Sequence, residues 1–367
     1  MTTIEHPSAR LDSEVARQLS AFAHEAEMSG DLHPKQMELI HSYKWFKMFI
    51  PESYGGLGLT LPEVVRLEES LAWADGSTAW VITLCAGAGW FIGFVDESIA
   101  MEFFTGDKLC VAGSGSATGT AEITNDGYLI NGSWPFASGS LHATAFTANC
   151  VIHHEGQPQL NADGAPRVLS FILKPDEVTV NKTWNAMGMV ATASNAFSVK
   201  NVHVSTQRCF EIHPSAVKID NPVYRFPFLQ LAETTLVANI AGSTVRFLDL
   251  AIGIMSDGSS NGTSICAGAV RKHTSVLNDL RTNVFVTLDK AWQQLLENGD
   301  VNDETLHAVT YSCHALARAC RAAINETYPL CGMEALPRES ERNRVWRNIH
   351  MALSHALFRK RMAVERY

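Results

Sequence analysis

The sequence predicts an α+β fold in which a central β barrel or sandwich separates an N-terminal helical domain from a C-terminal four-helix bundle. Three observations support this prediction. Helical periodicity fills the first hundred or so residues, the chain becomes rich in Thr, Val, Ile and Gly near Lys108, and long apolar helical stretches follow Pro227. We therefore expect three domains, at residues 1–107, 108–212 and 213–367.

Apolar residues recur at helical spacing between residues 11 and 48, so we expect helices there. The segment FIPESYGGLGLTLPE interrupts the pattern with paired glycines and prolines. Helical periodicity returns at 63–74 and again after Ser77, where Ser77 and Thr78 are candidate caps. The most apolar window, Ala79 to Val95, is expected to be a buried helix.

Short alternating runs predict the strands of the central unit. In AEITNDGYLING, Asp126 and Gly127 stand between two strand-like pieces, which is a strong signal for a β-hairpin. The segments ATAFTANCVI, RVLSFILK and NAFSVKNVHV are further expected strands. Short strands at close spacing favour a small barrel or sandwich.

Four long helices are expected in the last part of the chain. The first is FLQLAETTLVANIAGSTVRFLDLAIGIM, and the others are expected at 266–298, 304–327 and 341–366. Because the connections between them are short, we expect the four to pack as a bundle.

Charge and cysteine usage exclude several classes of protein. The formal net charge of −9 disfavours a nucleic-acid partner, because an acidic protein repels phosphate backbones. The eight cysteines form no C-x-x-C pair and no cluster with zinc spacing, so we expect reduced thiols and no metal site.

No Gly-x-Gly-x-x-Gly follows an expected strand, so a built-in nicotinamide domain is not expected.

The chain start and the hydropathy pattern predict a cytoplasmic protein. Glu5, Asp12 and Glu14 stand where a secretory signal needs a basic start and an apolar run. No stretch approaches 18 consecutive apolar residues, so no membrane association is expected.

Four motifs in order resemble the acyl-CoA dehydrogenase superfamily. FIPESYGGLGLTLPEVVRLEESLAWADGSTAW resembles its N-terminal signature, and DGYLINGSWPFASGS resembles the barrel motif that lies against the flavin ring. TWNAMGMVATASNAFSVKNVHVS resembles the later barrel motif, and NETYPLCGMEAL with ESERNRVWRNIHMALSHALFRKR resembles the last two helices. The resemblance covers residues from about 10 to 360. It implies an acyl-CoA dehydrogenase-like fold, FAD or FMN as cofactor, and a homotetramer.

The resemblance places three aromatic residues near the flavin. An isoalloxazine ring needs apolar or aromatic walls, and Trp134, Phe136 and Trp184 could supply them. The alternative is that Trp134 and Phe136 are ordinary members of a strand's buried face.

Small and hydroxyl residues are expected at the polar edge of the ring. Ala137, Ser138 and Gly139 are small enough for the backbone to approach the ring closely, and the N–H of Ser138 could face flavin N5. Thr192 and Ser194 match positions near the cofactor. The alternative for these two is that their hydroxyls bond to nearby backbone.

The segment RVWRNIHMALSH resembles the last helix of the reduced-flavin-dependent monooxygenases. The second His of that motif lies near the flavin, and here it is His355, with Arg347 and Asn348 ahead of it. A His there can help to activate oxygen and to deprotonate a phenol-like substrate, so His355 and Ser138 are the expected catalytic residues. His350 lies about 140° around the helix from His355, so both cannot face one site.

This resemblance implies a two-component monooxygenase. It would take reduced flavin from a separate flavin reductase and hydroxylate a small aromatic or heteroaromatic molecule with O2. The first alternative is an acyl-CoA dehydrogenase, which removes an α-proton with a carboxylate. The usual Tyr-Glu-Gly-Thr stretch is absent, and Glu339 and Glu341 stand among arginines on an expected solvated face.

Two departures from the monooxygenase pattern keep a flavin-less, non-enzymatic relative as a second alternative. Ala137 stands two residues before the motif glycine, where those enzymes usually carry a hydroxyl. The segment STAWVITLCAGAGWF lacks the His that some members carry there.

Overall fold

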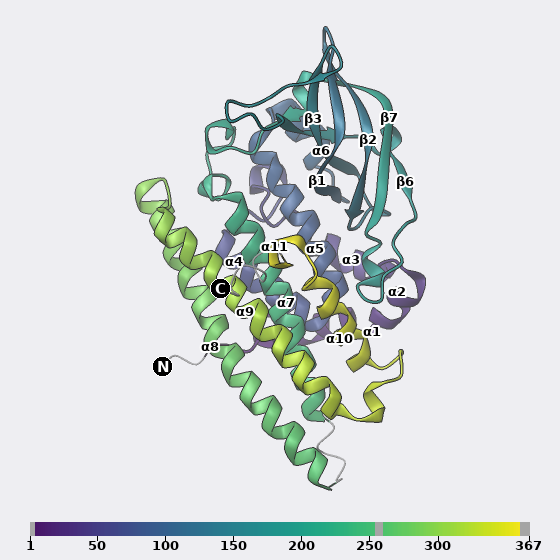
Figure 1. The fold of residues 1–367 in the computed structure, drawn as a ribbon, viewed down its shortest axis with the longest axis vertical. Coiled ribbons are helices and arrows are strands. Elements are labelled where there is room, and N and C mark those ends of the chain that lie inside the picture. Colours follow the sequence, from purple (N-terminus) through teal and green to yellow (C-terminus); the bar gives the residue numbers. More distant parts are fainter. Residues whose placement is uncertain (1–3, 254–259, 360–367) are drawn as a thin grey trace.

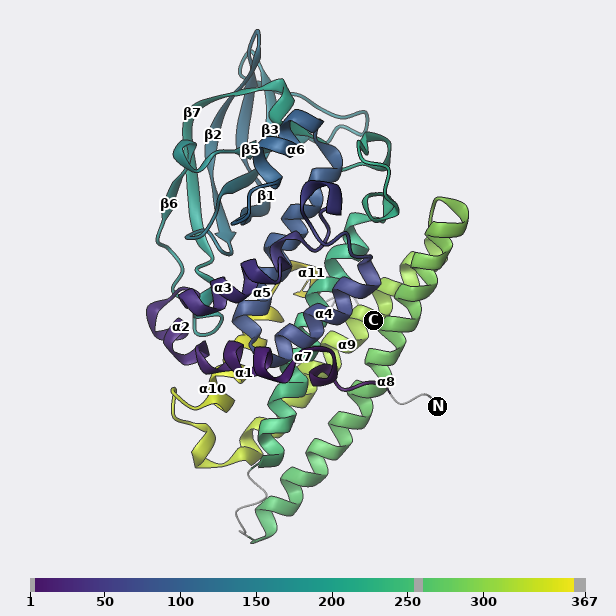
Figure 2. The ribbon, with the colours of Figure 1, turned by 180° about the vertical axis from the view of Figure 1, so that it is seen from behind.

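Helices, a β unit and further helices follow one another along the chain, as expected (Figure 1). The computed structural model describes residues 4–253 and 260–359. The β unit lies at one end of the molecule, and the helices that precede and follow it pack together at the other (Figures 1 and 2). The predicted order of a helical segment, a central sheet and a second helical segment is therefore confirmed.

The expected helical stretch at 11–48 is divided into several short helices. The helices before the sheet are α1 (Ser13–Ala21), α2 (Ala23–Ser29), α3 (Pro34–Ser42), α4 (Leu61–Ala74), α5 (Gly76–Gly89) and α6 (Glu97–Phe104). The Asp12 side chain caps the first turn of α1, and Gly30, with a φ of 71°, ends α2. Pro34 then stands at the first position of α3, where its fixed φ suits a helix start.

Asp75 alone joins α4 to α5. Its backbone N–H donates to the Leu71 carbonyl of α4. Its carboxylate accepts hydrogen bonds from the Thr78 N–H at 3.0 Å and the Thr78 hydroxyl at 2.6 Å. The cap is thus Asp75, and not Ser77 or Thr78 as expected, because its oxygen precedes the first turn and satisfies the free N–H groups there.

The β unit is a single sheet with the strand order β6-β7-β2-β1-β3-β5-β8, and β4 pairs with β3. The strands are β1 (Val111–Ile123), β2 (Gly127–Ala137), β3 (Ala145–His154), β4 (Gln157–Pro158), β5 (Val168–Leu173), β6 (Thr179–Asn181), β7 (Asn195–Ser205) and β8 (Cys209–Phe210). The antiparallel pairing of β1 with β2 reaches Ile123 opposite Tyr128, which confirms the hairpin at Asp126 and Gly127. All the expected strand segments form strands.

The sheet curls around a core of its own. Phe146 of β3 and Phe197 of β7 are three strands apart in the sheet order, yet their ring centroids are 5.1 Å apart. Tyr128 of β2 and Phe171 of β5 are also three strands apart, and their centroids are 5.1 Å apart. In a flat sheet, strands three apart would be separated by about 14 Å. The sheet must therefore bend enough for its two halves to face each other.

Within the described residues, three long helices and two shorter ones follow the sheet. They are α7 (Phe228–Ile252), α8 (Ser260–Asn298), α9 (Asp303–Thr327) and α10 (Glu341–Ala352), with the short α11 (Ala356–Arg359) at the end. Helix α7 packs against α8, α9 and α10. The single helix expected at 341–366 is wrong, because it stops at Ala352 and a turn precedes α11. Residues 360–366 of that expectation lie outside the described residues.

Among the described residues, two segments are long and apolar enough to cross a membrane by length and composition, Gly76–Phe94 and Phe228–Ile252. Within the fold, 78% and 72% of their most apolar windows are buried. The first segment confirms the buried helix that the apolar window predicts. Both segments are core helices of this fold.

Glu68 and Glu69 of α4 are both buried but differ in their surroundings. The Glu69 carboxylate accepts hydrogen bonds from Arg281 Nε at 2.6 Å and Nη2 at 2.8 Å. Glu68 is fully buried beside Thr83 of α5, and its oxygens have no well-formed hydrogen bond within the described residues. Burial raises the pKa of Glu68 to about 8, although the nearby Thr83 hydroxyl lowers it somewhat. Glu68 is therefore mostly protonated at neutral pH.

We predict that Glu68 makes the protein less stable as pH rises. Its pKa is near 4.5 when unfolded and about 8 when folded. The folded state binds this proton more tightly, so the stabilisation is complete below the unfolded pKa and is lost as pH rises through about 8. Glu68→Gln should be more stable than the parent at alkaline pH, by on the order of a few kcal/mol. Urea unfolding in mildly acidic and in alkaline buffer measures both proteins.

The adjacent Glu69→Gln variant is the control. It leaves Arg281 buried without its ion-pair partner, so it should lose about 3–5 kcal/mol in both buffers. An identical pH dependence in the parent and in Glu68→Gln would contradict the prediction.

Candidate active site

Helix α5 lies between the β unit and the C-terminal helices and contacts both (Figure 1). Its Ser77 hydroxyl accepts a hydrogen bond from Asn348 Nδ2 of α10 at 3.2 Å. Its Trp80 ring meets the His355 ring edge to face, with centroids 6.0 Å apart. Its Cys85 sulfur lies 3.7 Å from the carbonyl oxygen of the residue that follows β2. One helix thus aligns the end of β2, helix α10 and the His355 turn.

A bulge at the end of β2 turns one aromatic side chain outward. Trp134 pairs with Phe197 of β7 and Ala137 pairs with Asn195, so β2 has one residue more than β7 between these pairs. Phe136 accommodates the extra residue with a φ of 65°, and 65% of its surface is exposed. A positive φ at a bulky residue costs on the order of 1–3 kcal/mol and is typical of functional sites.

Trp134 lies inside the β unit. It is fully buried and stacks on Phe197, with centroids 5.1 Å apart, and its Nε1 donates to the Asn149 carbonyl at 2.8 Å. A Cβ at Gly119 or Gly132 would overlap the indole ring, so both glycines make room for it. Trp134 is therefore a member of the buried face of its strand, the alternative given above, and not an exposed wall for the flavin.

Phe136 and Trp184 remain as the aromatic pair at the surface of the β unit. Their rings are edge to face, with centroids 6.3 Å apart. The Trp184 Nε1 donates to the Met189 carbonyl at 2.9 Å, and the Trp184 N–H donates to Asn195 Oδ1 at 3.1 Å. Both hydrogen bonds fix the orientation of Trp184, so the pair can form an ordered apolar wall.

Three of the expected site hydroxyls form one hydrogen-bonded chain. Ser138 Oγ lies 2.8 Å from Ser194 Oγ, and Ser194 Oγ lies 2.7 Å from Thr192 Oγ1. The Thr192 hydroxyl donates to the Met189 carbonyl at 2.7 Å. All three side chains are buried. The chain links the end of β2, the start of β7 and the loop between β6 and β7.

The backbone at the expected ring edge is already hydrogen bonded. The Ser138 N–H donates to the Phe136 carbonyl at 3.1 Å, and the Gly139 N–H donates to the Thr192 carbonyl at 2.9 Å. The expected contact between the Ser138 N–H and flavin N5 is therefore not available in this conformation. Ala137 and both hydroxyl residues of this turn, Ser138 and Ser140, are buried.

Arg347 and Asn348 of α10 hold the loop that carries Met189. Asn348 Oδ1 accepts a hydrogen bond from the Met189 N–H at 2.6 Å. Arg347 Nη1 donates to the Met187 carbonyl at 2.7 Å and pairs with Glu27 of α2. Arg347, Asn348 and Glu27 are buried. The contacts join α2, α5, α10 and the β unit at one point.

His355 lies in the turn between α10 and α11, and not on a continuous helix. It is half-buried, and burial lowers its pKa below the ordinary value of 6.5. Its Nδ1 accepts a long hydrogen bond from the Leu357 N–H at 3.4 Å. A neutral imidazole that accepts at Nδ1 carries its proton on Nε2. His355 therefore has an N–H donor at Nε2.

His350 of α10 packs against a neighbouring aromatic ring of the same helix. Its ring meets Trp346 edge to face with centroids 4.5 Å apart, and its buried Nε2 has no partner within the described residues. Burial and the nearby Arg321 guanidinium lower the pKa of His350. The structure thus separates His350 from His355, although the helix-angle argument for that separation does not apply across the turn.

The two glutamates expected on a solvated face differ in the structure. Glu339 is exposed, but Glu341 accepts hydrogen bonds from Arg246 Nε at 3.0 Å and Nη2 at 2.7 Å. The neighbouring Arg344 is buried, which the solvated-face expectation missed. The expected face forms only in part because α10 packs against α7, which carries Arg246.

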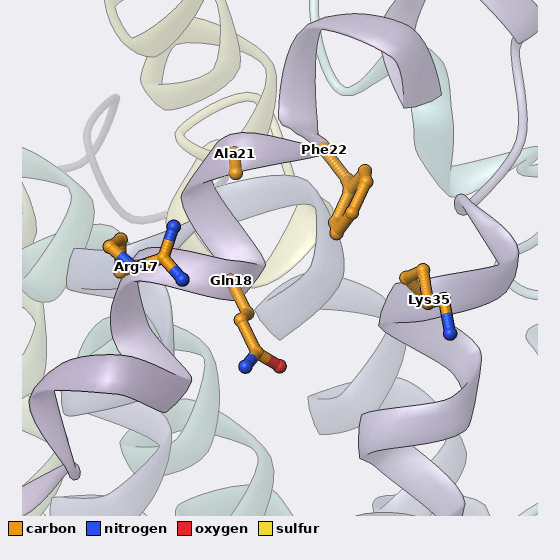
Figure 3. A pocket seen from close by; sticks show the side chains of 5 residues that line it. All are labelled: Arg17, Gln18, Ala21, Phe22 and Lys35. Atoms are coloured by element: carbon orange, nitrogen blue, oxygen red, sulfur yellow. The ribbon is translucent and has the colours of Figure 1, made fainter.

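A shallow surface hollow of about 320 Å³ lies elsewhere, beside α1 and α3 (Figure 3). It is lined by Arg17, Gln18, Ala21, Phe22 and Lys35. None of these residues belongs to the elements that carry the hydroxyl chain or His355. We therefore place the candidate site at the end of β2 and not in this hollow.

Asn195 and Asn348 hold backbone groups at the site, and the sequence alone did not predict this role for either residue. Asn195 was expected only as the first residue of a strand, yet its side chain holds the backbone of Trp184. Asn348 was noted only as a neighbour of His355, yet it holds the Met189 N–H. An amide side chain next to apolar residues was the available signal in both cases.

Two family models match the chain. The acyl-CoA dehydrogenase N-terminal domain matches residues 9–96, and the acyl-CoA dehydrogenase C-terminal domain matches residues 260–360. Among curated relatives, the flavin-dependent monooxygenase oxygenase subunit HsaA of Rhodococcus jostii is 23% identical over 91% of this chain and 90% of its own length. The indole-3-acetate monooxygenase of Pseudomonas putida is 24% identical over 92% of this chain and 86% of its own length.

Solved structures share the fold. The crystal structure of 3-HSA hydroxylase from a Rhodococcus species has a TM-score of 0.88 at 20% identity, covering 98% of this chain and 94% of that one. XiaF from a Streptomyces species, in complex with FADH2 and glycerol, has a TM-score of 0.83 at 19% identity, covering 96% and 93%. At such identities the likeness shows the architecture.

We predict that Asn348→Leu lowers stability by about 1–3 kcal/mol, because it leaves the buried Met189 N–H without an acceptor. The loss of order around Met189 should also shift the Trp184 fluorescence. Chemical denaturation and emission spectra measure the two effects. Asn185→Ala is the control, since Asn185 is exposed in the same loop and should change stability by no more than about 0.5 kcal/mol. Equal stability of both variants would contradict the assigned role of Asn348.

Proposed function

Because the chain belongs to the acyl-CoA dehydrogenase superfamily, in the branch of the flavin-dependent monooxygenases, we propose that it is the oxygenase of a two-component system. It hydroxylates a small aromatic or heteroaromatic substrate with O2 and reduced flavin. The observation that carries the proposal is the alignment by α5 of the β2 turn, the loop held by Asn348 and the His355 turn.

The residues at the end of β2 fit an isoalloxazine ring. Phe136 and Trp184 provide an apolar wall for the ring, whereas the Ser138 hydroxyl is buried in the turn that follows and is bonded to Ser194. FAD and FMN share this ring, and XiaF was solved with FADH2. Reduced flavin, when bound, supplies the electrons that activate O2. The departure from the family pattern at Ala137 remains, because Ala137 and Ser138 are both buried.

His355 orients the substrate. With its proton on Nε2, the neutral imidazole donates a hydrogen bond to a substrate oxygen. Accepting a proton from a phenol at Nε2 would require the imidazole to carry its other proton on Nδ1, where the Leu357 N–H now donates. Its lowered pKa keeps His355 neutral at physiological pH. An aromatic substrate is supported by the similarity to an indole-3-acetate monooxygenase.

For the acyl-CoA dehydrogenase alternative, the two candidate bases are Glu339 and Glu341. That reaction needs a carboxylate free to take an α-proton from the substrate. Glu341 is paired with Arg246, and Glu339 is exposed to solvent. These contacts favour the monooxygenase.

The similarity to the family also supports proposals on the architecture, the flavin supply and the oligomeric state. We infer that the curled sheet is a barrel, that the domains divide at residues 107 and 212, and that α7 to α10 form a four-helix bundle. A separate reductase supplies the flavin in the cytoplasm. Exposed apolar side chains on α8 and α9, among them Val286 and Tyr311, support a homotetramer packed through these helices.

We predict that the protein binds reduced FAD or FMN through the Phe136 and Trp184 wall. Phe136→Ala should weaken binding about 3- to 10-fold, because it removes an aromatic contact with the ring. Anaerobic titration calorimetry with both flavins in both redox states measures the affinities. Leu160→Ala changes another exposed apolar residue, which pairs with Pro166 outside the β2 turn, and this variant should bind as the parent does. Failure of the parent to bind any of the four would favour the flavin-less alternative.

We predict that His355→Ala lowers turnover by about 10²-fold while the fold is retained, because the substrate loses its hydrogen-bonding partner. Product formation from a panel of phenols and indoles, with chemically reduced flavin and O2, measures this. His350→Ala and Glu339→Gln should retain turnover. A fully active His355→Ala, together with bleaching of bound flavin by an acyl-CoA that depends on Glu341, would reverse the choice between the two enzyme classes.

A further inference from the structure

The short helix α11 carries His355 at its start. The His355 carbonyl accepts hydrogen bonds from the Phe358 N–H at 3.0 Å and the Arg359 N–H at 3.2 Å. Its ring Nδ1 accepts the Leu357 N–H at 3.4 Å. A residue whose carbonyl and side chain both accept from the first turn is the N-cap of a helix. The place of the His355 ring therefore depends on where α11 lies.

One buried side chain fixes the place of α11. This helix of four residues is too short to be stable by itself, so tertiary contacts must hold it. Phe358 is its buried side chain, with 1% of its surface exposed. The Phe358 ring meets the ring of His314 in α9, with centroids 5.3 Å apart. Phe358 thus anchors α11 on α9 at His314.

A buried network behind His314 fixes this anchor point. His314 Nε2 lies 3.1 Å from Oε1 of Glu233 in α7. The other carboxylate oxygen accepts from the Thr310 hydroxyl at 2.6 Å, and Gln230 Nε2 donates to that hydroxyl oxygen at 3.1 Å. All four side chains are buried. Displacing the His314 ring would leave the buried Glu233 carboxylate short of a donor, which is costly, so the ring is held in place.

Trp80 of α5 is the second contact that holds His355. The two rings meet edge to face with centroids 6.0 Å apart, and Trp80 is buried. Helix α5 also reaches the turn after β2 through Cys85. The His355 ring is therefore held both by a helix that reaches the candidate site and by a short helix anchored on α9.

We propose that Glu233 and His314 are positioning residues for the reaction, because through Phe358 they hold α11, and α11 holds the His355 imidazole as an Nε2–H donor in a fixed orientation. The Leu357 N–H occupies Nδ1, which keeps the proton of the neutral ring on Nε2. Glu233 and His314 are buried in the helical core, so they act through His355. This inference rests on the proposed function, which assigns the hydrogen bond with the substrate to His355.

The first test removes the anchor. In Phe358→Ala the cap loosens and the His355 ring becomes more hydrated, so the pKa of His355, which burial lowers, should rise toward 6.5. Turnover should fall about 10-fold, which is part of the loss expected for His355→Ala. NMR titration of protein labelled in its histidine rings measures the pKa, and His355→Ala identifies the signal. Product formation from phenols and indoles, with chemically reduced flavin and O2, measures turnover.

A double variant separates positioning from general damage. If Phe358 acts only through His355, the combination of Phe358→Ala with His355→Ala should be no slower than His355→Ala alone. A loss that is independent of His355 would instead multiply with the loss caused by His355→Ala.

A further variant guards against misfolding. In His314→Gln the glutamine amide can still donate to Glu233, while the ring that meets Phe358 is lost, so the pKa of His355 should again rise. Phe226→Ala is the matched control, because Phe226 is an equally buried phenylalanine whose ring meets Trp292 of α8. This control should lose stability and leave the pKa of His355 unchanged.

The outcomes separate the inference from the proposed function. A His355 pKa that is unchanged in both Phe358→Ala and His314→Gln overturns the inference, and a slow His355→Ala then leaves the proposed function intact. An equal rise of the pKa in Phe226→Ala also overturns the inference, because it would show a general loosening of the core. Losses that multiply in the double variant overturn it as well. A fully active His355→Ala overturns the role of His355 in the proposed function, and the positioning role with it.

Discussion

The site depends on how one peptide, that of Met189, is held. Asn348 fixes its N–H, and its carbonyl orients both the Trp184 indole and the Thr192 hydroxyl. The preceding Gly188 fits because a Cβ there would lie 2.4 Å from the Arg347 carbonyl. The backbone of α10 at Arg347 thus lies directly against the backbone of the loop at Gly188. A loop without regular secondary structure acquires a defined conformation because its polar groups are satisfied from another part of the chain.

Backbone strain is concentrated at the same place. Phe136, Met189 and Ala193 all have positive φ although none is a glycine. Each such residue costs on the order of 1–3 kcal/mol, so the surrounding contacts must offset the sum. The strain has a visible result, since it turns Phe136 outward and aligns the hydroxyls of its neighbours. The bulge in β2 and the turn before β7 are therefore parts of one arrangement.

Buried charges join the helical segments across long stretches of sequence. Arg281 of α8 pairs with Glu69 of α4, and Arg347 of α10 pairs with Glu27 of α2. Such pairs add little net stability, but they make the wrong packing costly, because a displaced helix would leave a buried charge alone. Glu68 is the exception, since it is buried without a cationic partner in the part of the chain that the structure describes and remains mostly neutral. The helices therefore support the β unit in a defined orientation.

The sequence by itself determined the order of helices and strands, the hairpin at Asp126 and Gly127, and the family, because periodicity, turn residues and motifs are local. The tertiary structure decided which aromatic side chain faces outward, because the β2 bulge depends on pairing with β7. It also decided that the last helix breaks before His355 and that Asn348 holds a loop 159 residues away. Local patterns set which elements form, whereas contacts between distant segments set the rotamers, strained dihedrals and proton directions that make a site.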